Sequence, residues 1–66
     1  MKPDWKDSPE WAKYLAQDQD GLWWWYESKP IISYDAWVPV DGDEFEEAEL
    51  LYGDSWKETL QEKPIV

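Results

Sequence analysis

The clearest pattern in the chain is the aromatic run Leu22-Trp23-Trp24-Trp25-Tyr26, which directly follows the turn-forming residues Asp18-Gln19-Asp20-Gly21. Aromatic residues favour strands, and glycine adopts the positive φ that a tight turn requires. The segment before the turn pairs with the run in a register that matches aromatic residues and opposite charges. The matched pairs are Lys13 with Glu27, Tyr14 with Tyr26, Leu15 with Trp25 and Ala16 with Trp24. The pattern therefore predicts a β-hairpin over residues 12–27, with a three-residue loop.

The segment before the turn also carries the signals of a helix. Ser8-Pro9-Glu10 supplies a capping hydroxyl and an early proline, and Trp11, Tyr14 and Leu15 share helical spacing. A helix over residues 9–17 is therefore an open alternative to the first strand. If the hairpin forms, both of its faces carry aromatic side chains. One face then covers a core, and the other requires a second layer or a partner.

The rest of the chain predicts one further strand and two short helices. Residues 31–38 are rich in β-branched and aromatic side chains and end before Pro39, which predicts a third strand. Asp43 can cap a helix over residues 44–52, which ends at Gly53. A last helix over residues 55–62 would bury Trp56 and Leu60. We therefore expect an α+β fold, in which one or two helices pack on an antiparallel sheet of about three strands.

The length of the chain limits its organisation and its chemistry. At 66 residues it is a single small domain over residues 11–66, preceded by a polar arm over residues 1–10. It has no cysteine and no histidine, which excludes disulfides, thiolate metal sites and imidazole bases. No apolar stretch approaches the ~20 residues that span a bilayer. Seven tryptophans can hold so short a chain together, because each buries a large area.

Paired carboxylates are abundant, but they do not predict an enzyme. Acid–base chemistry on a sugar needs one carboxylate in an apolar pocket beside a wide cleft, which a chain of this size rarely supplies. Asp18-x-Asp20-Gly21 also resembles a fragment of a calcium loop, yet Ala16 and Tyr26 occupy positions where that pattern needs oxygen ligands. We interpret it as the hairpin turn, and we expect no catalytic residue, no metal and no cofactor.

The charge of the chain indicates its partner. Sixteen acidic residues against six lysines give a net charge of −10, which repels nucleic acid and anionic membranes. The complementary partner is a protein with a basic surface, and such surfaces are typical of proteins that handle DNA.

The acidic run over residues 41–49 has two interpretations. It is either the solvated face of the predicted helix or an imitation of a phosphate backbone, with Phe45, Ala48 and Leu51 inward and Glu46, Glu47 and Glu49 outward. Aromatic residues anchor many interfaces, and with seven tryptophans we expect one or two to be partly exposed. The candidate partner-binding residues are Asp43, Phe45, Glu46, Glu47, Glu49, Tyr52, Trp23 and Trp25.

The chain shows two resemblances to known families. The first covers most of the chain and is to a Trp-rich small protein of tailed phages; it is carried by residues 5–12, the motif Ala16-Gln17-Asp18-x-Asp20-Gly21-x-Trp23-x-Trp25-Tyr26-Glu27, Pro30 and the segment Trp56-Lys57-Glu58-Thr59-Leu60-x-x-Lys63-Pro64. That family has no established activity, so the resemblance implies a phage origin and the cytoplasm of an infected bacterial host.

The second resemblance implies a function. Leu15-x-Gln17-Asp18-x-Asp20-Gly21 and Glu49-x-Leu51-Tyr52-Gly53 are similar to the small phage-encoded uracil-DNA glycosylase inhibitor, an acidic dimeric DNA mimic. In that family a hairpin and an aromatic strand are followed by a helix. This chain departs from it by roughly a dozen extra residues between the motifs. Ala48 also stands where the inhibitor has a functionally important Phe, and Phe45 is a possible substitute.

These observations favour a non-enzymatic inhibitor that mimics DNA and occupies the nucleic-acid site of a host DNA-acting protein. Uracil-DNA glycosylase is the best named target, restriction and CRISPR nucleases are variants, and a homodimer is possible. The alternative is a structural or adaptor module of a phage, in which acidity serves only solubility. Mimicry requires the carboxylates on one face of the molecule, whereas an adaptor tolerates them all round.

Overall fold

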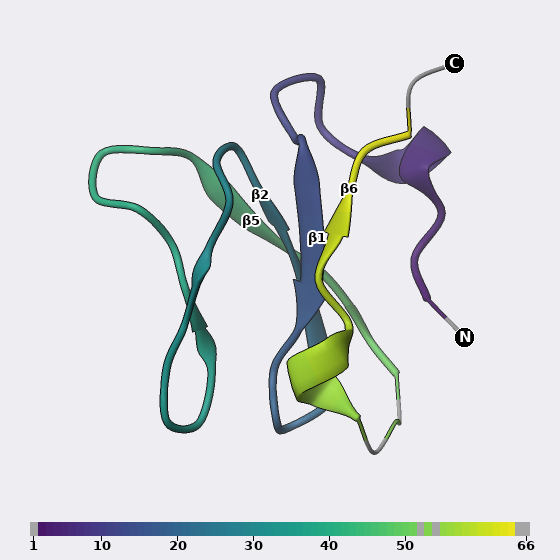
Figure 1. Cartoon of the computed structure of the whole chain (residues 1–66). Helices are drawn as coiled ribbons and strands as arrows, with labels where there is room; N and C mark the ends of the chain where they lie inside the picture. Colours follow the sequence, from purple (N-terminus) through teal and green to yellow (C-terminus); the bar gives the residue numbers. More distant parts are fainter. Residues whose placement is uncertain (1, 52, 54, 65–66) are drawn as a thin grey trace.

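The computed structural model of the chain describes residues 2–51, 53 and 55–64 (Figure 1). A four-stranded antiparallel sheet has the order β5-β2-β1-β6, and a separate two-stranded ribbon is formed by β3 and β4. None of the described residues lies in an α-helix, so the prediction of an α+β fold is wrong. The elements are η1 (Trp5–Asp7), β1 (Tyr14–Gln17), β2 (Leu22–Tyr26), β3 (Ile31–Ile32), β4 (Trp37–Val38), β5 (Phe45–Leu50), η2 (Trp56–Glu58) and β6 (Gln61–Glu62).

The central hairpin has the predicted register. Strands β1 and β2 pair Tyr14 with Tyr26, Leu15 with Trp25 and Ala16 with Trp24. The turn closes where Gly21 N donates to Asp18 O at 3.0 Å, and Gly21 has a φ of 93°. A Cβ at Gly21 would meet Leu51 O at 2.9 Å, so glycine is required there by both conformation and space. The alternative helix over residues 9–17 does not form.

The predicted helix over residues 44–52 is strand β5 instead. It pairs with the second edge of β2, setting Phe45 opposite Tyr26 and Glu46 opposite Trp25, with an irregularity between Leu22 and Trp24. The reason is non-local. The backbone groups on that side of β2 need partners, and a helix would leave them unpaired. Helix propensity is a weak preference that such pairing overrides. Tyr52, at the end of the predicted helix, lies outside the described residues.

The predicted helix over residues 55–62 is also wrong. Only Trp56–Glu58 forms a short 3-10 turn, after which β6 pairs with β1. The Thr59 hydroxyl accepts from Gln17 N at 2.8 Å and donates to Trp56 O at 2.7 Å, which ends the turn and guides the chain onto the edge of β1. Trp56 and Leu60 nevertheless pack against the buried residues Ala16, Tyr26 and Trp37, although no helix places them there.

The third predicted strand, over residues 31–38, folds back on itself. Ile31 pairs with Val38 and Ile32 with Trp37, and Ser33 N donates to Ala36 O at 2.8 Å across a tight turn. Serine and aspartate favour turns because their side chains bond nearby backbone groups. The sequence Ser33-Tyr34-Asp35-Ala36 therefore divides the β-forming run into the two strands of the ribbon.

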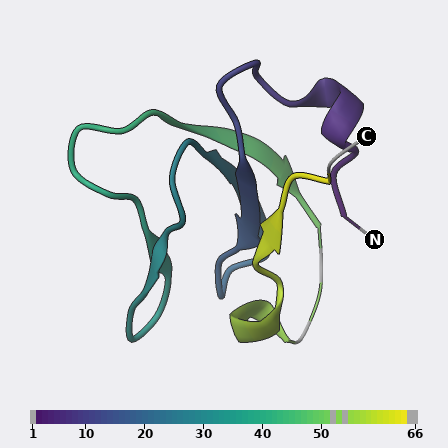
Figure 2. The same cartoon turned by 45° about the horizontal axis from the view of Figure 1, so that its top comes forward.

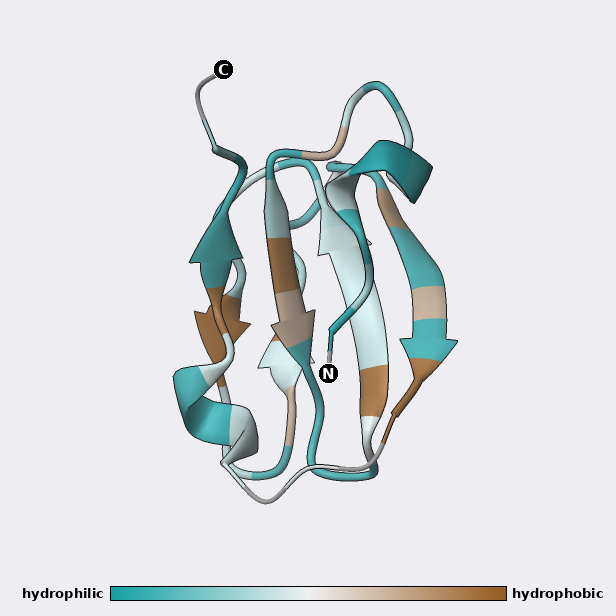
Figure 3. Cartoon of the chain, turned by 90° about the vertical axis from the view of Figure 1, so that its right-hand side faces the viewer, coloured by the Kyte–Doolittle hydropathy of each residue, from teal (hydrophilic) through white to brown (hydrophobic). Residues whose placement is uncertain are grey.

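Each face of the four-stranded sheet is covered by a different part of the chain (Figure 2). On one face Leu15, Trp23 and Trp25 are buried under the N-terminal segment, whose Trp5 ring lies 5.1 Å from that of Trp25. Figure 3 looks onto this face, with the N-terminal segment crossing in front of the strands. On the other face Trp37 of the ribbon packs against Ala16 and Tyr26. Tryptophans from outside the sheet thus supply both covering layers, which leaves no structural need for a helix.

Candidate functional site

The two edges of the sheet carry opposite charge patterns. The chain over residues 41–49, which contains most of β5, has six carboxylates and no lysine. At the opposite edge Lys63 N donates to Lys13 O at 2.7 Å, and the Lys2 ammonium donates to Gln61 of β6 at 3.1 Å. Lys57 lies in η2, just before β6. Four of the six lysines therefore belong to the β6 edge, and the acidic residues of the β5 edge have no cation within their own segment.

A groove of about 230 Å³ runs between β5 and the N-terminal segment. Four carboxylates line it, and lysine does not. Its lining residues are Pro3, Asp7, Trp25, Glu46, Glu47, Ala48 and Glu49. Buried Pro3 anchors the segment that carries Asp7, and the pairing of β5 with β2 fixes the glutamates. The groove is therefore a concentrated negative surface that would attract cationic groups.

The candidate residues on β5 lie together at this edge. Glu46, Glu47 and Glu49 are exposed, and Ala48 packs on the core between them. Phe45 is 49% exposed, with its ring 5.9 Å from that of Trp24. Figure 3 shows β5 as the outermost strand on the right, teal where the glutamates lie. The structure thus brings Phe45 and the three glutamates onto a single edge strand.

The other candidate residues are placed differently. Trp23 and Trp25 lie in the core, 4% and 2% exposed, because they share the face that the N-terminal segment covers. Asp43 is partly buried in the turn before β5, where its N–H donates to Val40 O at 3.1 Å. Tyr52 lies outside the described residues. Of the two tryptophans, only Trp25 lines the acidic groove.

The ribbon carries exposed apolar side chains that are not among the candidate residues predicted from the sequence. Tyr34 at its tip is 95% exposed and Ile31 is 62% exposed, and Ile32 and Val38 are also exposed. A cluster of exposed apolar side chains typically marks a binding surface. The turn residues between two short β-forming runs were the signal that a ribbon would project these side chains.

A small cavity of about 120 Å³ lies on the ribbon side of the sheet, between Asp18, Trp24, Tyr26, Trp37, Pro39 and Phe45. Whole small molecules occupy pockets of about 300–1,000 Å³, so this cavity admits only the end of a side chain. Burial raises the pKa of Asp18, and the nearby charges of Asp20 and Asp35 act in the same direction. The Trp37 N–H, which donates to Asp18 at 2.9 Å, opposes them. Burial and the charge of Asp18 also raise the pKa of Tyr26.

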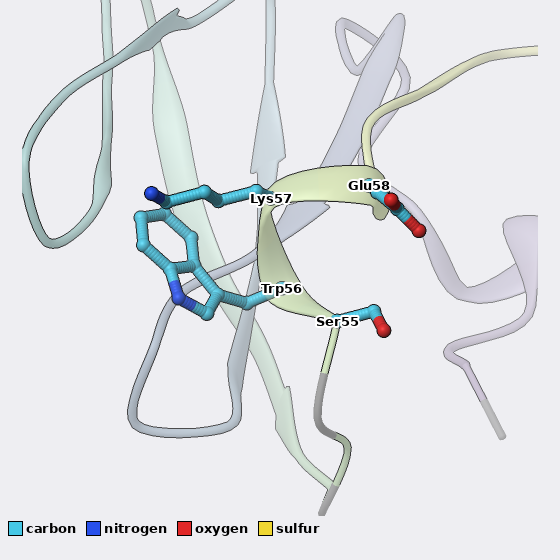
Figure 4. Close-up of a pocket in the computed structure, with 4 residues that line it drawn as sticks. All are labelled: Ser55, Trp56, Lys57 and Glu58. Atoms are coloured by element: carbon cyan, nitrogen blue, oxygen red, sulfur yellow. The ribbon is translucent and has the colours of Figure 1, made fainter.

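A further hollow of about 250 Å³ lies beside η2 (Figure 4). Its lining comes from the single segment Ser55, Trp56, Lys57 and Glu58, with the Lys57 ammonium 5.6 Å from the centroid of the Trp56 ring. These side chains spread apart in Figure 4 and do not converge on a common point. The hollow therefore lacks the arrangement of a ligand site.

Two kinds of feature are absent from the described residues. They contain no group of three or more potential ligands able to hold a metal ion. Within the same part of the chain, no helix is long and apolar enough to cross a membrane. No protein-family model, curated protein or solved structure matches the chain.

Proposed function

We propose that the protein is a non-enzymatic inhibitor that mimics DNA and occupies the basic nucleic-acid site of a DNA-acting protein in a bacterial host cytoplasm. The observation that carries this proposal is the segregation of charge to the β5 edge. Carboxylates that served solubility alone would be spread around the molecule. Six carboxylates without a lysine over residues 41–49, with Asp7 across the groove, present one sign of charge in one place.

The spacing of the carboxylates supports mimicry in a different way from the predicted helix. An extended strand rises ~3.4 Å per residue, so the four carboxylates from Glu44 to Glu49 span about 17 Å, with a mean separation of roughly 6 Å. Each strand of duplex DNA carries one phosphate per ~3.4 Å. The edge strand thus presents a line of negative charge at somewhat less than twice the phosphate spacing of a single DNA strand, and it does so from an exposed position.

The exposed apolar ribbon favours a second candidate function. Ile31, Ile32 and Tyr34 would suit an adaptor or self-association surface, as in a structural module of a phage particle. In a mimic, the same side chains would contact an apolar feature beside the nucleic-acid site. The two functions differ in one consequence, because only mimicry makes DNA compete for the partner.

The general test is capture of proteins from a bacterial lysate on the immobilised chain, followed by elution with duplex DNA. Mimicry predicts that DNA displaces the captured proteins, because they use the same site for both. Capture that DNA does not displace would reject mimicry and support the adaptor function. Uracil-DNA glycosylase, the target implied by the resemblance, is tested separately by uracil excision with excess protein. Undiminished excision eliminates that enzyme as the target.

The contribution of the edge is tested with two variants of equal net charge. Glu46→Gln, Glu47→Gln and Glu49→Gln together remove three carboxylates from β5, and Glu10→Gln, Glu58→Gln and Glu62→Gln remove three exposed ones elsewhere. At low salt we expect the first variant to associate with the captured partner about 10–100-fold more slowly, because charge steers encounter. The second should change the rate by less than about threefold. Equal effects would mean that only net charge matters.

A further inference from the structure

The outer side of β5 presents backbone groups that the sheet does not use. Glu27 N donates to Glu44 O at 3.1 Å, which makes these two residues a hydrogen-bonded pair of the antiparallel ladder. Such pairs alternate along the ladder, so Trp25 and Glu46 form the next one. Phe45 and Glu47, opposite Tyr26 and Trp24, are non-bonded positions. Their N–H and C=O groups therefore point away from β2.

These groups lie on an accessible edge. Strand β5 ends the order of the four-stranded sheet, and within the described ranges its second side pairs with no strand. Five of its six residues are exposed. Natural proteins usually shorten such an edge, bulge it or place charges on it, because an open ladder recruits other strands. At the opposite edge β6 is only two residues long.

Charge selects the strand that can be added. A second copy of the chain pairing β5 with β5 would bring glutamates opposite glutamates, and like charges directly opposite each other destabilise a ladder. A strand carrying lysine or arginine would instead meet opposite charges. Side chains alternate between the two faces along a strand, so Glu47, opposite Trp24, points to the ribbon side and Glu46, opposite Trp25, to the side of the N-terminal segment, while both residues contribute to the lining of the groove that contains Asp7. The two glutamates thus occupy opposite faces at successive positions.

We propose that β5 binds its partner by strand addition, taking up an extended segment that contains two adjacent basic residues. The added strand bonds to the outward N–H and C=O groups of Phe45 and Glu47, as in other cases where a peptide extends a sheet. One basic side chain lies beside Glu47, and the next enters the groove at Glu46 and Asp7. This mode of binding rests on the proposed function in one respect, which is the basic character of the partner.

The test uses a synthetic peptide and amide hydrogen exchange in the full chain. The probe is an acetylated peptide amide, Thr-Val-Arg-Arg-Val-Thr, and the reference is Pro-Val-Arg-Arg-Pro-Thr, which has the same charge but fewer backbone donors. We expect the first peptide to slow exchange of the Phe45 and Glu47 amides about tenfold or more at saturation. The Glu46 amide, bonded to β2, should exchange slowly with or without peptide. The proline peptide should bind at least about fivefold more weakly.

Two substitutions at one residue separate the backbone from the charge. Glu47→Pro removes the outward N–H, which an edge strand tolerates because that group is not bonded to β2. Glu47→Gln removes the charge and keeps the N–H. We expect Glu47→Pro to weaken peptide binding about tenfold or more, and Glu47→Gln only about two- to fivefold. Circular dichroism of the tryptophans checks that both variants fold, and if Glu47→Pro does not fold, the exchange measurement decides.

Several outcomes would overturn strand addition. The first two are equal binding of the two peptides and absence of binding at millimolar peptide. The third is peptide binding that leaves exchange of the Phe45 and Glu47 amides unchanged. The fourth is slower exchange of these amides as the protein concentration rises without peptide, which would indicate pairing between copies of the chain. The proposed function fails separately. If Glu47→Pro still binds a DNA-displaceable partner normally, strand addition is wrong and mimicry stands. If the peptide binds as described but DNA displaces no captured protein, strand addition stands and mimicry is wrong.

Discussion

The two edges of the central sheet differ in length, charge and exposure. Strand β5 is six residues long, acidic and exposed, whereas β6 is two residues long and lies among lysines. Both edges belong to the same four-stranded sheet, so their difference lies in the length of each edge strand and in the residues that it carries. A short edge is the simplest protection against unwanted pairing. The longer acidic edge offers an open ladder while discouraging pairing with copies of itself.

This difference shows where the acidity of the chain is concentrated and where it is balanced. Around β6 the lysines lie near Glu58 and Glu62, which keeps that region close to neutral. Around β5 no lysine is present in the segment, and the groove with Asp7 adds to the negative charge. A net charge of −10 is thus mostly a property of one side of the sheet. Substitutions in the central strands, which both edges share, should show how far the stability of each edge depends on the centre of the sheet.

The largest effect is expected for Trp25→Ala, in the strand between the two edges. Trp25 is 2% exposed and packs against Trp5, and its removal should cost about 3–5 kcal/mol. A domain of this size has only about 3–10 kcal/mol of total stability, so most or all of the cooperative urea transition should disappear. The control is Tyr34→Ala, at a 95% exposed position, which should change stability by less than about 0.5 kcal/mol. Similar losses for both would contradict the assigned core.

The next effect concerns Gln17, which joins the two edges. Its side-chain amide donates to Leu51 O at 2.6 Å, just after β5, and to Gly21 O at 3.1 Å. Its backbone N–H donates to Thr59, just before β6. Gln17→Met keeps the length and removes the donor, which should cost about 1–3 kcal/mol in urea unfolding because Leu51 O loses a buried partner.

The matched control for this substitution is Gln61→Met in β6. The Gln61 side chain accepts from Lys2 at the surface, where a hydrogen bond contributes little. We expect a change of less than about 0.5 kcal/mol. If Gln61→Met cost as much stability as Gln17→Met, the loss would come from placing methionine instead of glutamine in a strand, and not from the buried hydrogen bonds.

The parts of the fold that follow from local sequence were predictable. The register of β1 and β2 follows from the turn at Gly21 and from the alternation of aromatic side chains on both sides of it. Phe45, Ala48 and Leu51 have a spacing that suits a helix, yet the open edge of β2 draws the same residues into a strand. That pairing joins segments about 20 residues apart, and no local pattern encodes it.

The candidate site was predictable in the same partial way. Glu46, Glu47 and Glu49 are exposed in the strand, as the predicted helix would also have placed them. Trp23 and Trp25 are buried because Trp5, in the arm that was predicted to be polar, and Trp11, just after it, cover their face of the sheet. The exposed apolar residues are instead on the ribbon, at positions such as Tyr34. Covering layers depend on distant contacts, so composition alone does not show which tryptophans a partner can reach.

The smallest effect is expected for Asp18→Asn, which tests whether a negative charge at this position lowers the stability of the fold. Asp18 lies in the hairpin turn and not on β5, and burial raises its pKa above the ordinary value of 3.8. The folded protein therefore holds the Asp18 proton more tightly than the unfolded chain does. The contribution of this group to stability is least favourable at neutral pH and improves as the pH falls through the folded-state pKa.

Asparagine is neutral at every pH and keeps an oxygen to accept from Trp37 N. The Asp18→Asn variant should consequently melt at the same temperature as the parent protein or slightly above it at pH 7. That difference should shrink as the pH falls toward 4, while the other carboxylates titrate equally in both proteins. Asp35→Asn, which removes only a neighbouring charge, should act in the same direction and more weakly. If Asp18→Asn lost more than about 1 kcal/mol at pH 7, the charged hydrogen bond to Trp37 would outweigh the cost of burial. The negative charge of Asp18 would then stabilise the fold itself, in addition to the binding role that we propose for the carboxylates of β5.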